Sequence, residues 1–182
     1  MLETLITSKT RIKLLIKFFL NAGTKAYLRE LASEFGTSTN SIRLELNKLT
    51  KAKLLKSENT GRTINYMANK NHTLFLDIHN VVQKYMGIDK VIEKLVRKLG
   101  KLESAYLIGD YAHGIDSGLI DIVLIGNVNR TEMDRISLKT GYEIKRKIRL
   151  LAISKKELLQ LWKQLDMEHA LLLWGNPIKF SQ

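Results

Sequence analysis

The polar residues best suited to contact a nucleic acid recur at helical spacing: Asn40, Arg43, Asn47 and Lys51. They alternate with Ile42, Leu46 and Leu49, which repeat at i, i+4 and i+7 and predict the buried side of one helix. An Arg guanidinium can donate two hydrogen bonds to a guanine edge, and an Asn amide can pair with adenine. The spacing therefore predicts a helix whose outer side can contact base edges.

The elements that position this helix are expected on both sides of it. Apolar residues at helical spacing predict helices over 9–21 and 27–35, and Gly36 ends the second because glycine readily adopts a left-handed conformation. Ser38 or Thr39 can cap the third helix. Two short extended runs flank a turn that contains Gly61, which indicates a β-hairpin. Three helices and a hairpin can place the third helix in a major groove.

This order of residues resembles the ArsR-like winged helix-turn-helix regulators over about residues 1–70. The resemblance rests on Tyr27-Leu-Arg-Glu-Leu-Ala, on Gly36 and on the run Gly61-Arg62-Thr-Ile-Asn-Tyr66, and it departs at Lys53, where a glycine commonly precedes the wing. It implies double-stranded DNA as the partner, read by a recognition helix over 38–52 and a wing over 55–67. The residues implied to contact DNA are Ser38, Thr39, Asn40, Arg43, Leu44, Asn47, Lys48, Arg62 and Thr63.

Basic residues concentrate in the same part of the chain. Residues 1–70 hold 13 Lys and Arg against 5 Asp and Glu, whereas residues 71–182 hold 17 against 13. The net charge of +12 favours a polyanionic partner, and lysines such as Lys51, Lys53 and Lys56 add phosphate attraction that salt should weaken. Two alternatives remain: the charges form only a solvated face, or the winged helix contacts another protein.

Two amphipathic helices are predicted over 73–86 and 88–99, and we interpret residues 71–100 as a helical connector. A single winged helix reads only a few base pairs, so symmetric half-sites favour a homodimer. The apolar faces of the connector are the candidate dimer interface. The alternative is that they only bridge the two domains.

From residue 101 the pattern becomes α/β. Buried strands are expected at 105–108 and 120–125, then a helix capped by Thr131 and ending near Gly141, and a strand over 144–153. Ser154 and Glu157 have the spacing of a capping box for a further helix, and 171–174 is a short strand or helix end.

The strand-loop-strand run over 107–125 resembles the core of minimal nucleotidyltransferases. In that family a Gly-Ser loop lets backbone amides approach a triphosphate, and an Asp-x-Asp pair with a third carboxylate on a later strand holds magnesium. Gly109 and Gly114 match the two glycines, and Asp121 matches the first carboxylate. The resemblance implies an α+β chain with three parts: a winged helix-turn-helix (1–70), the helical connector (71–100) and an α/β nucleotidyltransferase-like domain (101–182).

Three positions depart from that family. Asp110 stands in place of the Ser, Val123 in place of the second carboxylate and Arg149 in place of the third. One carboxylate cannot hold two magnesium ions, and Arg149 beside Asp121 is expected to form an ion pair. We therefore predict a DNA-binding transcriptional regulator whose second domain senses or interacts without catalysis, with a vestigial nucleotide site at Gly109, Asp110, Gly114 and Asp121.

Several other readings of the second domain remain open. The glycines could be ordinary turn glycines of an unrelated α/β domain, Asp110, Asp116 and Asp121 could form a rearranged metal site, and the domain could be an active magnesium-dependent nucleotidyltransferase or a protein-interaction adaptor. We predict no cofactor and no metal site, because the chain has no cysteine and its four histidines are scattered, each expected to be structural or exposed: His72, His79, His113 and His169. No signal peptide or membrane span is expected, so the predicted location is the cytoplasm.

Overall fold

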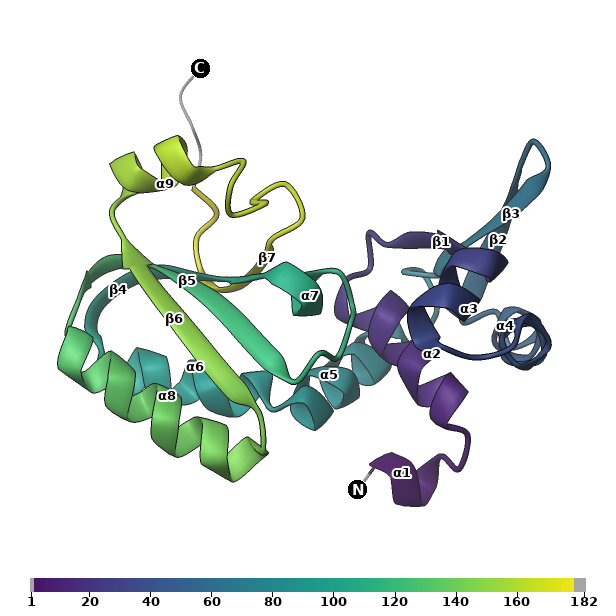
Figure 1. Ribbon diagram of the computed structural model, residues 1–182, viewed down its shortest axis with the longest axis horizontal. Helices are drawn as coiled ribbons and strands as arrows, with labels where there is room; N and C mark the ends of the chain where they lie inside the picture. The colour runs from purple at the N-terminus through teal and green to yellow at the C-terminus, as the bar shows by residue number, and fades with distance from the viewer. Residues whose placement is uncertain (1, 179–182) are drawn as a thin grey trace. The chain divides into compact units, whose positions relative to one another are not determined.

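The chain forms two compact units, Met1–Tyr85 and Met86–Gln182, and its class is mixed α and β, compatible with the predicted α+β fold (Figure 1). The structure, a computed structural model, describes residues 2–178. The boundary between the units falls inside the segment 71–100 that was expected to connect two domains. Helix α5 (Phe75–Met86) lies almost wholly in the first unit, and helix α6 (Ile88–Lys98) lies in the second.

The first unit contains α5 and seven earlier elements. In chain order these are α1 (Leu2–Leu5), α2 (Lys9–Leu20), β1 (Lys25–Tyr27), α3 (Leu28–Phe35), α4 (Thr39–Lys51), β2 (Leu55–Thr60) and β3 (Thr63–Ala68). The strands form an antiparallel sheet in the order β1-β3-β2. Helices α2, α3 and α4 and the hairpin agree with the prediction, whereas the very short α1 and β1 were not predicted.

Capping residues set the ends of the helices as the sequence indicated. The Ser38 hydroxyl accepts a hydrogen bond from the Ser41 backbone amide at 3.2 Å and begins α4. Gly36 has a φ of 61° and closes α3 in the left-handed conformation. Apolar side chains of the three helices and of β2 fill the core of this unit, among them Leu14, Phe18, Phe19, Leu31, Ile42, Leu46 and Leu55.

The second unit is built on a four-stranded sheet in the order β6-β5-β4-β7. After α6 its elements are β4 (Gly100–Ile108), α7 (Gly109–Ala112), β5 (Leu119–Val128), α8 (Arg130–Ile144), β6 (Lys147–Ile153), α9 (Lys155–Leu161) and β7 (Leu171–Gly175). Only β5 and β6 are parallel, because α8 forms the crossover between them. Helices α6 and α8 cover one face of the sheet, and α9 lies over the other (Figure 1).

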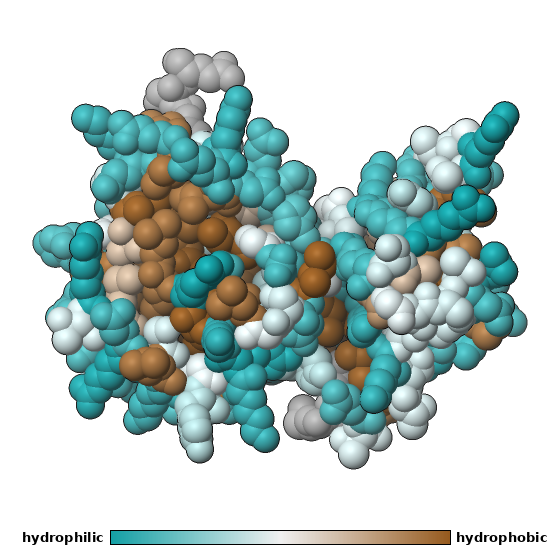
Figure 2. Space-filling model, viewed as in Figure 1, coloured by the Kyte–Doolittle hydropathy of each residue, from teal (hydrophilic) through white to brown (hydrophobic). Residues whose placement is uncertain are grey.

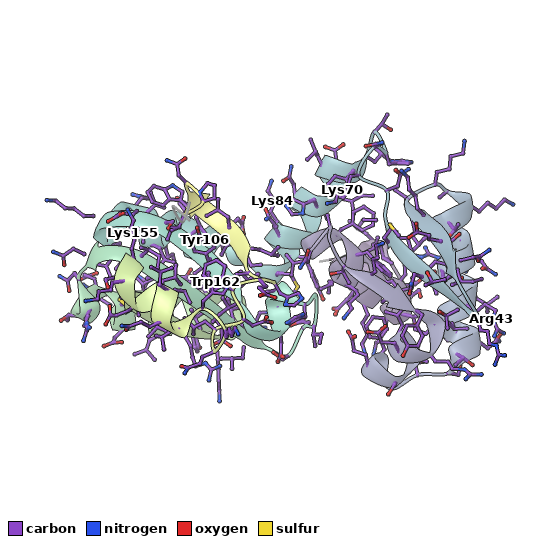
Figure 3. The ribbon with its side chains drawn as sticks, turned by 90° about the horizontal axis from the view of Figure 1, so that it is seen from above. Arg43, Lys70, Lys84, Tyr106, Lys155 and Trp162 are labelled. Atoms are coloured by element: carbon purple, nitrogen blue, oxygen red, sulfur yellow. The ribbon has the colours of Figure 1, made fainter. Side chains whose placement is uncertain are left out.

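Alternate residues of the strands supply the core beneath α9. Tyr106, Val123 and Ile125 pack with Leu158 of α9 and with Met167. Trp162 joins this cluster, and Figure 3 shows its position with Tyr106 in the second unit. Because side chains alternate across a strand, Asp121 points to the same face of β5 as Val123 and Ile125.

Two boundaries in this unit differ from the prediction. Asn129, not Thr131, caps α8: its side-chain oxygen accepts a hydrogen bond from the Glu132 amide at 3.2 Å. The helix also continues to Ile144, which was assigned to a strand, and ends where Lys145 adopts a φ of 57°. The capping box at the start of α9 is confirmed, with reciprocal bonds between Ser154 and Glu157.

Among the described helices, none combines the length and the apolar character that crossing a bilayer requires.

Candidate functional site

The predicted outer face of α4 is open to solvent. Ile42 and Leu46 are fully buried and Leu49 is 5% exposed, so the opposite face points outward. The side chains predicted to contact DNA on and next to α4 are all exposed: Ser38, Thr39, Asn40, Arg43, Leu44, Asn47 and Lys48. Arg43 projects from the outer surface of this unit (Figure 3). The structure therefore leaves all of these residues open to solvent.

A buried carboxylate anchors α4 to α2. Glu45 accepts a hydrogen bond from Arg11 Nε at 2.7 Å and one from Lys48 Nζ at 3.2 Å. Burial acts to raise the pKa of Glu45, but the hydrogen bonds from Arg11 and Lys48 outweigh it and leave the pKa lowered. Lys48 was predicted as a DNA contact, and its ammonium group is therefore engaged with Glu45 while the side chain stays 60% exposed.

The hairpin tip presents the two wing residues predicted to contact DNA. Gly61 and Arg62 form the turn between paired Thr60 and Thr63, and Gly61 has a φ of 61°. Arg62 is exposed, whereas the Thr63 hydroxyl donates a hydrogen bond to the Thr60 carbonyl at 3.1 Å. The Thr63 side chain thus stabilises the turn.

Basic side chains without a local counter-ion surround this surface. Within residues 2–178, no ion pair involves any of the exposed cations Arg43, Lys51, Lys53, Lys56 and Arg62. Uncompensated exposed cations attract phosphate more strongly than paired ones, because no local carboxylate competes.

The second unit contains a cavity of about 680 Å³ beside the N-terminal parts of β5 and β6. Its wall includes Gly109 and Asp121, predicted nucleotide-site residues, together with Arg149 and Asp166. Much of the remaining wall is apolar and comes from Ile108, Ile122, Ile148, Leu150, Leu151 and Leu165. Figure 2 shows apolar surface over the β6 side of this unit.

The predicted ion pair between Asp121 and Arg149 is confirmed. The parallel register of β5 and β6 pairs these two residues, and the guanidinium donates two hydrogen bonds to the carboxylate, at 2.5 and 2.7 Å. The hydrogen bond to Asp121 raises the pKa of Arg149, with a smaller contribution from the charge of Asp110. The Asp121 side chain is 13% exposed and that of Arg149 is 70% exposed.

Gly109 allows the loop to approach this carboxylate. It has a φ of 65°, and a Cβ atom at this position would lie 3.1 Å from Asp121 Oδ2. Gly109 is also the first residue of the short helix α7, where a loop was expected, and Asp110 is exposed on the first turn of this helix. Gly114 is buried beyond the end of α7 and does not line the cavity.

The magnesium site that the nucleotidyltransferase resemblance implies does not fit the residues present here. Asp121 supplies one carboxylate, and both its oxygens accept hydrogen bonds from Arg149. Val123 is fully buried and apolar. Magnesium prefers several oxygen ligands in octahedral geometry, which this position does not offer.

The three aspartates considered as a rearranged metal site are not brought together. Asp116 accepts hydrogen bonds from the Tyr111 hydroxyl and from Arg146 Nη2, the latter at 2.9 Å. Burial acts to raise the pKa of Asp116, but the bonds from Arg146 and Tyr111 lower it below its ordinary value. Burial, with a further contribution from Asp116, raises the pKa of Tyr111. Asp116 therefore belongs to a structural network.

Two of the four histidines contact the same aspartate. This cluster was not predicted from the sequence. His113 Nε2 lies 2.8 Å from Asp166 Oδ2, and His169 Nδ1 lies 2.7 Å from Asp166 Oδ1. The hydrogen bond from His169 lowers the pKa of Asp166, and the bond to Asp166 raises the pKa of His169. The spacing Asp-x-x-His at 166–169 was the available signal, but His113 lies more than fifty residues earlier in the chain.

Comparison with known proteins gives partial similarities to solved structures. No family model and no curated protein matches the chain. A toxin–antitoxin structure with AMP-PNP is 21% identical over 48% of this chain and 73% of that chain, with a TM-score of 0.41. A structure of a tri-AMPylated Shewanella oneidensis HEPN toxin with its MNT antitoxin is 18% identical over 50% of this chain and 71% of that chain, with a TM-score of 0.38. Reduced HlyU from Vibrio cholerae is 16% identical over 46% of this chain and 82% of that chain, with a TM-score of 0.37.

These similarities correct one prediction. From the sequence, the chain was predicted not to be an enzyme, because two of three carboxylates are replaced. The similar structures include several of the MntA–HepT type, one of them with an AMPylated toxin, so the prediction that this chain is not an enzyme does not stand.

Proposed function

We propose that the first unit is a winged helix-turn-helix domain that binds double-stranded DNA, with α4 in the major groove and the β2–β3 hairpin against the flanking backbone. The exposed polar face of α4 opposite Ile42 and Leu46 carries this proposal. Arg43 and the two asparagines Asn40 and Asn47 supply the side chains that can pair with base edges. On this proposal the chain is a transcriptional regulator.

A fluorescence anisotropy titration with random and genomic duplexes at several salt concentrations tests the proposal. Arg43→Ala should lower the affinity for the preferred sequence by about 1 to 3 kcal/mol and relax base preference. Arg62→Ala should weaken all duplexes similarly and reduce the salt slope by about 1. Arg97→Ala removes the same charge from an exposed position of the second unit and serves as the matched control. Equal binding by all three variants would refute the placement of the DNA-binding surface.

We further propose that the chain acts as a homodimer. Apolar side chains remain exposed on and just before α5: Leu74 is 51% exposed, Leu76 66% and Val81 46%. Burial of such side chains in a symmetric interface would remove them from water and place two α4 helices on one duplex. Sedimentation equilibrium of the parent chain and of a Leu76→Glu variant would test this.

A second function, nucleotidyl transfer, is proposed for the second unit. The cavity beside Gly109 carries this proposal, because the largely exposed guanidinium of Arg149 can bind a phosphate there while its apolar wall can contact a base. In this reaction the oxygen of an acceptor hydroxyl forms a bond to the α-phosphorus of a nucleoside triphosphate. The hydroxyl proton passes to solvent, and pyrophosphate leaves.

Incubation with α-labelled ATP and a divalent cation tests this second function. Label should pass to the chain or to a partner protein, and Arg149→Ala and Asp121→Ala should reduce the transfer. Asp134→Ala, which changes an exposed carboxylate of α8 at the same cavity, separates a specific effect from a general loss of charge. An absence of transfer by the parent chain with each nucleotide and cation tried would refute it.

A further inference from the structure

We propose that His113, Asp166 and His169 form a zinc-binding site at the rim of the cavity. Each residue offers one ligand atom, and these atoms all lie within 4.8 Å of one another. Two imidazole nitrogens and a carboxylate oxygen are ligands of catalytic zinc sites, which keep a fourth position open. Magnesium prefers oxygen ligands, so the two imidazoles select a transition metal.

Separate parts of the chain bring the three ligands together. His113 follows α7 at its C-terminal end, whereas Asp166 and His169 lie in the turns after α9. The Asp166 backbone has a φ of 49°, a conformation uncommon for residues other than glycine. From this position its two oxygens contact the two rings separately, and the rings lie 4.9 Å apart between centroids.

The present hydrogen bonds show how an ion can enter. Tetrahedral zinc at about 2.0 to 2.2 Å from its ligands requires ligand atoms about 3.4 Å apart. The two nitrogen–oxygen distances are 2.8 and 2.7 Å, and the ligand atoms as a group lie within 4.8 Å of one another. To bind the ion, the two short contacts must open and the wider spacings must close, each by less than about 1.5 Å. All three side chains are at least 40% exposed, which leaves them room to move. Each neutral imidazole then carries its proton on the other ring nitrogen.

The position of this site gives it a role in the cavity. Asp166 lines the cavity together with Asp121 and Arg149, whereas neither histidine does, so a bound ion lies at the rim of the cavity. Its open coordination position can then accept a phosphate oxygen or a water molecule. This role in the cavity rests on the proposed nucleotidyl transfer, whereas zinc binding itself does not.

Zinc binding is tested on the full chain after removal of metal, without nucleotide, by competition with a chromophoric chelator. We expect one Zn²⁺ per chain, and we expect at least tenfold weaker binding for His113→Gln, for His169→Gln and for Asp166→Asn. Glutamine retains a hydrogen-bond donor toward Asp166, so these two variants separate metal binding from a structural contact. Thermal unfolding without metal checks that each variant is folded.

The control is His72→Ala, which removes a histidine of the first unit and should leave the affinity unchanged. An excess of Mg²⁺ should not displace the zinc. The proposal is overturned if the parent chain binds no Zn²⁺, or if the folded glutamine variants bind it as tightly as the parent does. Since no nucleotide is present, this outcome is independent of whether the chain transfers nucleotides.

Discussion

Removal of the Asp116 carboxylate should destabilise the second unit strongly. Tyr111 is fully buried, and the Arg146 side chain is only 15% exposed. Arg146 donates to the Tyr111 hydroxyl at 2.7 Å and to Asp116 at 2.9 Å. Asp116→Ala removes the counter-ion of a largely buried guanidinium and the acceptor of a buried hydroxyl.

The size of this effect follows from the two lost interactions. A hydrogen bond to a charged group contributes about 1.5 to 3 kcal/mol, and loss of one partner from a buried ion pair costs about 3 to 5 kcal/mol. The Asp116 side chain is 30% exposed, so water screens part of the interaction and we expect about 2 to 4 kcal/mol. With a urea m-value of about 2 kcal/mol/M, the midpoint should fall by roughly 1 to 2 M.

Tryptophan fluorescence in a urea titration measures this loss selectively. The only two tryptophans, Trp162 and Trp174, both lie in the second unit, so their signal follows that unit. Asp134→Ala removes an exposed carboxylate of α8 and should barely move the midpoint. The reasoning is refuted if Asp116→Ala and Asp134→Ala unfold at the same urea concentration.

The lowered pKa of Asp116 also predicts how its contribution to stability changes with pH. The folded pKa of Asp116 lies below its ordinary value of 3.8, so its stabilising effect is complete above that pH and is lost as the pH falls through the folded pKa. Asp116→Asn lacks this titration. The difference in midpoint between the parent chain and Asp116→Asn should therefore be largest near neutral pH and should shrink at about pH 3.

Two further substitutions test backbone conformation. Lys53 has a φ of 59°, so Lys53→Gly should stabilise the first unit by about 1 kcal/mol while Lys53→Ala should not, as measured by far-UV circular dichroism during thermal unfolding. Gly126→Ala should lower the free energy of unfolding of the second unit by at least about 3 kcal/mol, because its Cβ would lie 2.2 Å from the Lys101 carbonyl oxygen. Gly118→Ala, at an open left-handed position, should cost about 1 kcal/mol. Equal urea midpoints of the two variants in tryptophan fluorescence would contradict the clash.

Most helices and strands could be predicted because local patterns determine them. The stripe of Ile42, Leu46 and Leu49 defines the buried side of α4, and Ser38 and Gly36 define where helices begin and end. The missed elements are only three or four residues long, too short for a periodic pattern, and one of them also depends on a distant partner. For example, β1 is three residues long and exists because it pairs with β3, about forty residues later.

The candidate sites could be predicted only where one segment carries them. The polar face of α4 lies within a single helix, so its spacing was sufficient. The cluster of His113, Asp166 and His169 joins a loop and a turn that are far apart in the chain, and no local periodicity connects them. The pairing of Asp121 with Arg149 was predictable only through the family resemblance, which aligned two separate strands.

The register of β5 and β6 explains the charge arrangement at Asp121 in the cavity wall. These strands are parallel and directly adjacent, so residues 121 and 149 face each other at the same level of the sheet. Two carboxylates at these positions would repel each other unless a cation lay between them. Arg149 supplies that positive charge from within the chain, and its bidentate contact occupies both oxygens of Asp121. Any metal ion used at this cavity must therefore be held by other side chains, and the cluster of His113, Asp166 and His169 contributes Asp166 to the cavity wall.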